Sequence, residues 1–167
     1  MPQLSILHQS ILSALDSLID RLNSTREQSV IAILVGTTDG IGLARCYGTA
    51  AQPNLSEEIL SSVETIWSTL PSNSPQGAGN LLHALRMGTI QSSIAFYNDD
   101  LAMIHLHLFP LMVTVLANGN LANMGAIRAN FEAIRNLLEP LRRELENNLH
   151  QQQQTAYGGG PVGVMKV

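Results

Sequence analysis

Two histidines, His105 and His107, are the residues whose types and spacing come closest to a metal site. They stand two positions apart in an apolar run, so on a β-strand both side chains would share one face. A zinc site needs three or four ligands. The remaining candidate ligands have no diagnostic spacing: His83, Asp99, Asp100 and Cys46. We therefore favour two half-buried histidines on a sheet face beneath a helix, and a small His-based metalloenzyme is the less favoured alternative.

The glycine-rich run from Gly36 to Gly42 resembles a phosphate-binding loop only superficially. A P-loop has Lys and then Ser or Thr after its last glycine, whereas Leu43, Ala44 and Arg45 follow here. Asp39-Gly40 lies between two apolar runs, and this dipeptide is typical of a hairpin turn because glycine adopts a positive φ without strain. We predict a β-hairpin at this point rather than a nucleotide-binding loop.

Two further reactive groups lack the neighbours that catalysis requires. The Asp99-Asp100 pair follows a predicted strand, and a turn provides no pocket that would separate the two pKa values. Cys46 lies next to Arg45, but no histidine is placed by sequence to act as its base, so we predict a small core residue. The residues alone therefore predict no catalytic, cofactor-binding or metal site.

The composition is typical of one folded domain with part of its surface covered by a partner. The chain has 167 residues, 45% of them hydrophobic and only 13% charged, against a usual charged share of about 25%. Charged residues are depleted at the centres of protein interfaces. The net charge of −4 argues against nucleic-acid binding. A single cysteine excludes a disulfide-built secreted domain and fits a reducing compartment, and the N-terminal residues do not resemble a signal peptide.

One uncharged stretch, Leu101 to Ala117, requires comparison with a membrane span. It is shorter than the roughly 20 apolar residues of a transmembrane helix, and it contains two histidines and Pro110. Two buried strands that meet at Phe109-Pro110 explain the stretch better than a membrane helix. We therefore expect no membrane span in this stretch.

Hydrophobic periodicity predicts the order α-β-β-α-β-β-β-α. The predicted segments are a helix near 4–22, strands at 30–35 and 41–47, a helix at 55–69, strands at 91–97, 101–108 and 111–117, and a helix at 121–149. The segment 81–87 fits either a helix or a strand. The order describes an α+β fold, an α/β sandwich in which one five-stranded, mainly antiparallel sheet carries three helices, with helices on both faces.

Local signals refine the helices and the domain boundary. Asn54 with Glu57 predicts a capping box at the start of the second helix, and Pro140 predicts a kink or break in the third. The third helix also carries charge pairs typical of a solvated face, Arg128–Glu132 and Arg135–Glu139. Residues 1–149 are expected to form the domain. Residues 150–167, rich in Gln and Gly and without periodicity, are expected to be a disordered tail.

With these elements in place, the second half of the chain resembles the roadblock/LC7 superfamily, and within it the Ragulator-type scaffold subunits that partner MAP kinase kinase. The matching residues are Ser93 to Asn98, Met103 to Leu106, Phe109 to Ala117, Leu121 to Gly125 and the Leu138-Glu139-Pro140-Leu141 break. The Asp39-Gly40 hairpin also corresponds to a turn of that family. The resemblance covers about residues 4–147 and is closest from 91 to 146.

The resemblance implies a non-enzymatic scaffold or adaptor without cofactor. Roadblock proteins pair through the helix between the second and third strands and through the edge of the third strand. An unpaired strand edge is a surface that a partner should cover. The implied interface residues are Leu55, Ile59, Val63, Trp67, Ser92, Ile94 and Phe96. Of these, Trp67 fits the core of the domain as well as an interface.

The resemblance also implies partners and a location. The first partner would be a second roadblock-domain subunit, and the pair would dock Rag-type small GTPases, with a MAP kinase kinase as a further candidate. The complex would lie on the cytosolic face of late endosomes and lysosomes, held by a lipid-anchored partner, and would serve amino-acid signalling to the target-of-rapamycin kinase. Another roadblock role, as a dynein light chain or a small-GTPase regulator, is the alternative, because a fold alone does not choose between them.

Overall fold

The computed structural model describes residues 7–25, 30–48, 56–69, 90–97, 101–118 and 121–157. The strands are β1 (Val30–Thr37), β2 (Gly42–Tyr47), β3 (Ser92–Tyr97), β4 (Leu101–Leu108) and β5 (Leu111–Asn118). The helices are α1 (Gln9–Thr25), α2 (Glu57–Trp67), α4 (Leu121–Ala129) and α5 (Phe131–Tyr157). The strands form one antiparallel sheet of order β2-β1-β5-β4-β3, which confirms the predicted α+β fold.

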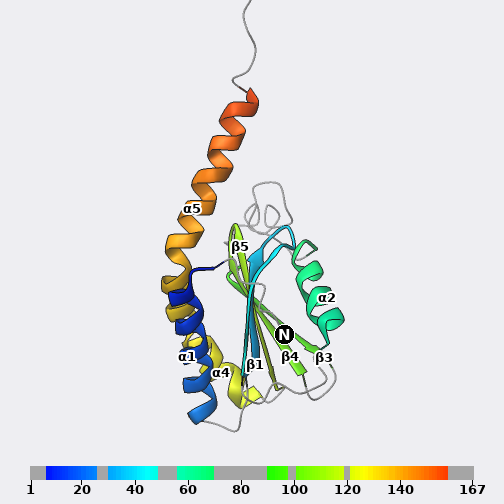
Figure 1. The fold of residues 1–167 in the computed structure, drawn as a ribbon. Coiled ribbons are helices and arrows are strands. Elements are labelled where there is room, and N and C mark those ends of the chain that lie inside the picture. The colour runs from blue at the N-terminus through cyan, green and yellow to red at the C-terminus, as the bar shows by residue number, and fades with distance from the viewer. Residues whose placement is uncertain are drawn as a thin grey trace, which may run out of the picture.

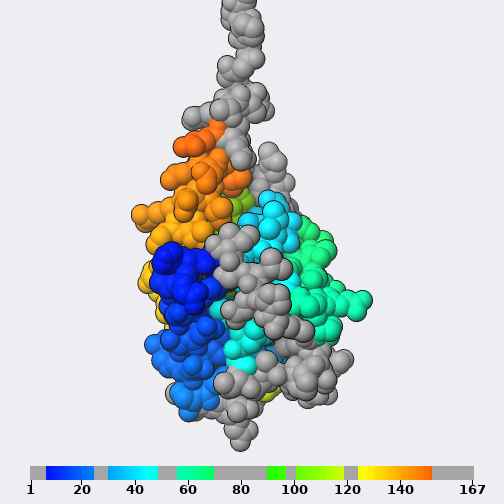
Figure 2. Space-filling view, in the orientation of Figure 1, coloured from blue at the N-terminus to red at the C-terminus, as the bar shows by residue number. Residues whose placement is uncertain are grey.

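The helices cover the two faces of the sheet unequally. Of the described helices, Figure 1 shows α1, α4 and α5 on one side of the sheet and α2 on the other. Alternate residues of β4 divide accordingly: Ile104 packs in the core beneath α1 and α5, whereas Met103 packs in the core beneath α2. The space-filling view places α1 beside α5 (Figure 2), where Arg21 donates a hydrogen bond to Asn130 at 2.8 Å. Among the described elements, the side with α1, α4 and α5 is therefore the thick face of the sandwich and the side with α2 the thin face.

The two predicted hairpins are present. Gly40 has a φ of 88° in the turn between β1 and β2, and the Thr37 amide donates to the Ile41 carbonyl at 2.9 Å. Strands β4 and β5 meet at Phe109-Pro110, so the uncharged stretch forms two strands, as predicted. No helix in the described ranges has the length and apolarity that crossing a membrane requires.

Helix α2 begins differently from the prediction. Its N-cap is Ser56, whose hydroxyl accepts a hydrogen bond from the Ile59 amide at 3.3 Å. A serine N-cap satisfies one of the free amides of the first turn, so the capping box assigned to Asn54 and Glu57 is wrong in its N-cap. Asn54 lies outside the described residues, as do the ambiguous segment 81–87 and the Asp99-Asp100 turn.

The C-terminal helical region differs from the prediction in its break and its end. The chain interrupts the helix at Asn130, between α4 and α5, and the helix α5 continues through Pro140. The side chain of Asn130 donates to the Ala126 carbonyl at 2.8 Å, and such side-chain bonds compete with helix continuation. The helix also runs to Tyr157, beyond the end of the sheet (Figure 1). Residues 150–157 are thus helical rather than a disordered tail, and 158–167 lie outside the described residues.

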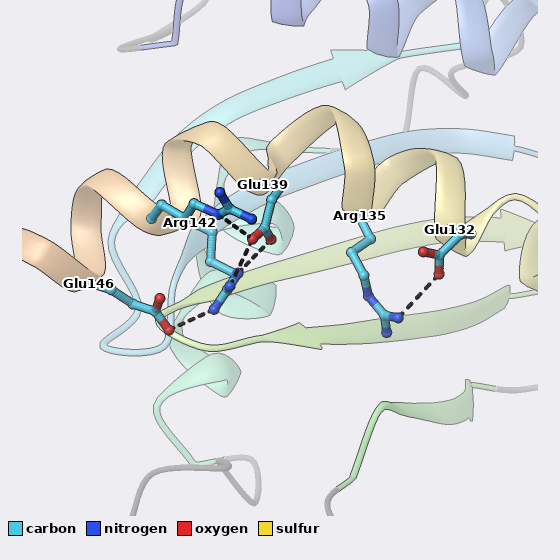
Figure 3. A network of polar contacts seen from close by, with 6 residues as sticks. Glu132, Arg135, Glu139, Arg142 and Glu146 are labelled. Atoms are coloured by element: carbon cyan, nitrogen blue, oxygen red, sulfur yellow. Dashed lines mark hydrogen bonds and ion pairs between the residues drawn. The ribbon is translucent and has the colours of Figure 1, made fainter.

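A row of ion pairs stabilises the outer side of α5. Glu139 accepts hydrogen bonds from Arg142 at 2.7 and 2.9 Å and from Arg143 at 2.8 Å, and these guanidinium groups lower its pKa to about 2. Arg142 also pairs with Glu146 at 2.6 Å, and Arg135 pairs with Glu132 at 3.1 Å (Figure 3). The predicted partners were therefore wrong in detail, because Arg135 turns back to Glu132 and leaves Glu139 to Arg142 and Arg143.

Candidate partner-binding surface

The two histidines are part of a buried polar row on the α2 face of the sheet. The indole nitrogen of Trp67 donates to the Thr114 hydroxyl at 2.7 Å, and His105 Nδ1 lies 2.8 Å from the same oxygen. His107 Nε2 lies 3.1 Å from the Ser93 hydroxyl. Burial, followed by the charge of the neighbouring His107, lowers the pKa of His105 to about 4, and burial also lowers the pKa of His107. Both rings are neutral at pH 7 and link β3, β4, β5 and α2.

The described residues hold no set of three or more His, Cys, Asp or Glu side chains arranged to bind a metal ion. Three of the candidate ligands, His83, Asp99 and Asp100, lie outside those residues. Cys46 is buried in the core beneath α1. Burial, then the Asp16 carboxylate, raises the pKa of the Cys46 thiol to about 12. A thiol that stays protonated is a poor nucleophile, so Cys46 acts as a core residue.

The glycine run makes room for side chains of α2. A Cβ atom on Gly36 would lie 1.9 Å from the Trp67 ring, and one on Gly42 would lie 2.7 Å from the Glu64 carboxylate. Gly40 supplies the positive φ of the turn. The pattern that superficially resembled a phosphate loop therefore reflects the close approach of a helix, which depends on the absence of side chains at these positions.

The β2 edge of the sheet is joined to α2 by a charged cluster. The guanidinium of Arg45 donates to both oxygens of Glu64, at 2.7 and 2.8 Å, and also to Glu57. The hydrogen bond to Glu64 is the largest influence that raises the pKa of Arg45. Glu64 is only 7% exposed. A buried bidentate pair of this kind fixes orientation as well as charge, so α2 is held over the β2–β1 half of the sheet.

The β3 edge lacks such a cluster. His107 donates its amide to the Gln91 carbonyl at 2.9 Å, and bonding residues alternate along an antiparallel pair. The backbone groups of Ser92, Ile94 and Phe96 therefore point away from β4. The side chains of Ile94 and Phe96 are 47% and 52% exposed. In the described part of the chain, β3 is thus an edge with both free hydrogen-bonding groups and uncovered apolar side chains.

A groove of about 420 Å³ lies between α2 and β4 on the thin face of the sandwich. It is lined by Glu58, Ile59, Ser62, Val63, Ile66, Leu101, Met103 and Leu116. Ile59, at the rim, is 43% exposed, whereas Val63, Met103 and Leu116 are buried beneath it. The groove is lined by β4, which pairs with the edge strand β3.

The structure places the predicted interface residues in different environments. Ile59, Ile94 and Phe96 are exposed, and Ser92 is half-buried. Val63 lines the groove, but Trp67 is completely buried, so Trp67 belongs to the core rather than to the predicted surface. Leu55 lies outside the described residues.

The exposed residues of the two elements do not share a face. Ile94 is paired with Ile104, which packs beneath α1 and α5, so Ile94 and Phe96 lie on the opposite side of the sheet from Ile59. A partner strand along β3 would reach both sides. Leu101 and Met103 of the groove were missed from the sequence, because only the strand register and the position of α2 assign them to it.

Comparison with solved structures identifies the fold. The gliding protein MglB from Thermus thermophilus matches with a TM-score of 0.60 and 11% identity, over 84% of this chain and 99% of that one. MglB from Myxococcus xanthus matches with a TM-score of 0.58 and 12% identity, over 81% and 97%. A roadblock/LC7 domain from Streptomyces avermitilis matches with a TM-score of 0.51 and 12% identity, over 78% and 97%. The chain therefore has the roadblock/LC7 fold.

At the level of sequence, neither a protein-family model nor a curated protein matches the chain. The identities of 11% and 12% to the solved structures establish the architecture and leave function to be argued from the surface. That surface consists of an open strand edge, the apolar side chains Ile94 and Phe96, and the groove beside α2.

Proposed function

We propose that the chain is a non-enzymatic adaptor of the roadblock type, which pairs with a second roadblock-domain subunit and, as a pair, docks a small GTPase. The observation that carries the proposal is the β3 edge. Its outward backbone groups and its two exposed apolar side chains, Ile94 and Phe96, form a surface that a second strand would extend and cover. The groove beside α2 would receive another part of the same partner.

The small-GTPase part of the proposal is supported by the roadblock/LC7 resemblance of the sequence and by the likeness in fold to MglB. The finer proposal is a Ragulator-type scaffold that docks Rag-type GTPases on the cytosolic face of late endosomes and lysosomes, through a lipid-anchored partner, with a MAP kinase kinase as a further partner. Its support is the sequence resemblance from residue 91 to residue 146.

The test is recovery of the tagged full chain from its native cells, with bound proteins identified by mass spectrometry. A second roadblock subunit together with Rag-type GTPases is the expected result. A roadblock subunit with dynein chains, or with a different GTPase, would retain the adaptor proposal and overturn the Ragulator assignment. Recovery of no roadblock-type protein would contradict the adaptor proposal itself.

Matched variants connect the recovery to the proposed surface. Ile94→Asp on β3 and Ile59→Asp at the rim of the groove should each abolish recovery of the partner, because an unpaired charge buried in an interface costs several kcal/mol (order of magnitude). Ile41→Asp is the control: Ile41 is 58% exposed in the β1–β2 connection, far along the sheet order from β3. Partner recovery with both Ile94→Asp and Ile59→Asp would place the interface elsewhere.

A further inference from the structure

The charges of α2 are not balanced within the helix. Its sequence contains three glutamates and no lysine or arginine. Arg45 of β2 pairs with Glu57 and with Glu64, which satisfies two of the three. The third, Glu58, is exposed and has no ion pair within the described part of the chain. It is the member of this group that faces the groove.

The groove combines this single carboxylate with apolar walls. Glu58 lines it together with Ile59, Ile66, Leu101 and Met103, and among the described residues of the lining none is cationic. An occupant that covers the apolar walls must also lie against Glu58. Desolvating a carboxylate without a counter-charge is unfavourable, so the groove is best complemented by an apolar segment that carries a lysine or arginine.

A second copy of this chain is a poor source of that cation. A copy paired along β3 would bring its own β3, β4 and α2 toward the groove. The strands β3 and β4 contain no lysine or arginine, Arg45 beside α2 is already bound to Glu57 and Glu64, and α2 itself would bring a second Glu58. Pairing of two copies would therefore bring carboxylates of both α2 helices toward one interface, and repulsion between like charges opposes association.

We infer that the groove between α2 and β4 is a heterotypic docking site, which takes an apolar segment of a different chain bearing a lysine or arginine opposite Glu58, and that Glu58 selects this partner over a second copy. The inference rests on the proposed pairing with another roadblock-domain subunit. It adds the chemistry of the partner segment and names Glu58 as a residue that determines specificity. Glu58→Gln changes the charge of this residue without changing the volume of the groove.

The first test measures affinity for the roadblock subunit recovered with the native chain, by isothermal titration calorimetry at about 50 and about 300 mM NaCl, which span weak and strong screening. Glu58→Gln should weaken binding about fivefold and Glu58→Lys more than about tenfold. Higher salt should weaken the wild type more than Glu58→Gln. Glu144→Gln is the control, because Glu144 is an exposed residue of α5 outside the groove. Equal affinities for all four proteins would overturn the inference.

The second test measures self-association of the full chain alone by sedimentation velocity and needs no partner. Glu58→Gln should increase the dimer fraction over the wild type at about 50 mM NaCl, and high salt should reduce the difference. Glu144→Gln should leave the dimer fraction unchanged. Unchanged self-association in Glu58→Gln would overturn the selective role of Glu58. A failure of this kind would differ from failure of the proposed function, which is indicated by partner recovery that survives both Ile94→Asp and Ile59→Asp.

Discussion

The two edge strands of the sheet, β2 and β3, differ in the side-chain contacts they make. At β2, Arg45 binds Glu57 and Glu64 of α2, so a charged cluster within the chain holds that edge strand to a helix. At β3, residues 92–97 contain no charged side chain, and Ile94 and Phe96 are exposed. Natural proteins commonly protect strand edges with charge or cover. The contrast supports the proposal that β3 is the edge at which a partner binds.

The largest expected effect comes from breaking the charged cluster at β2. Arg45→Met should lower the free energy of unfolding by about 4 kcal/mol, because it leaves the Glu64 carboxylate buried and unpaired. Urea denaturation of the chain alone measures the change. The control is Arg135→Met, whose partner Glu132 is 68% exposed and whose loss should cost at most about 1 kcal/mol.

A second variant tests whether the unpaired charge is the cause. Adding Glu64→Gln to Arg45→Met removes the orphaned carboxylate and should restore part of the lost stability. A double variant as unstable as Arg45→Met alone would show that the packing of the Arg45 side chain, rather than its charge, supports α2.

The next-largest expected effect concerns Gly36, which lies against the ring of Trp67. Gly36→Ala should lower the free energy of unfolding by about 3 kcal/mol, because a Cβ atom 1.9 Å from the indole ring forces Trp67 out of its place. Tryptophan emission should move toward that of an exposed ring, since Trp67 is the single tryptophan. Gly125→Ala is the control: its Cβ would meet nothing within 4 Å, and it should stabilise the helix α4 by up to about 1 kcal/mol.

These contacts mark where prediction from the sequence stops. Strand β4 was predicted at its observed bounds, because its continuous uncharged run and the Phe109-Pro110 turn are local signals. The contact between Gly36 and Trp67 joins residues 31 positions apart and depends on where α2 docks. The face occupied by Ile94 depends on strand register, and a shift of one residue reverses it. The predicted break at Pro140 was wrong, because α5 continues through this proline. The observed interruption lies at Asn130, between α4 and α5.

The β3–β4 side of the sheet, which carries His105 and His107, should be the first part of the sheet to lose stability as the pH falls. The pKa of His105 is lowered from 6.5 to about 4 in the folded chain, so the unfolded chain binds more protons between these values. Stability should be complete above about pH 6.5 and fall toward pH 4, with a slope of at most about 1.4 kcal/mol per pH unit for one histidine. Urea titrations of wild type and His105→Gln measure this, and the variant should show the smaller slope.

Hydrogen exchange then locates the acid effect. On lowering the pH from about 7 to about 5, His105 and His107 should gain charge in transiently opened states, so opening of β3 and β4 should become more favourable relative to β2. Protection factors for the three strands, corrected for the pH dependence of chemical exchange, measure the difference. Equal loss of protection in β2 and β3 would contradict the division of the sheet into a closed and an open half.

The smallest expected effect is on the stability of the chain when its open edge is changed. Ile94→Asp should alter the free energy of unfolding of the isolated chain by less than about 0.5 kcal/mol, because the side chain is 47% exposed and supports little of the core. The same substitution should abolish pairing with the second subunit. Ile41→Asp should change stability as little and leave pairing intact. A loss of stability in Ile94→Asp comparable to that of Arg45→Met would mean that β3 is built for folding, and that its exposed side chains are covered within the chain.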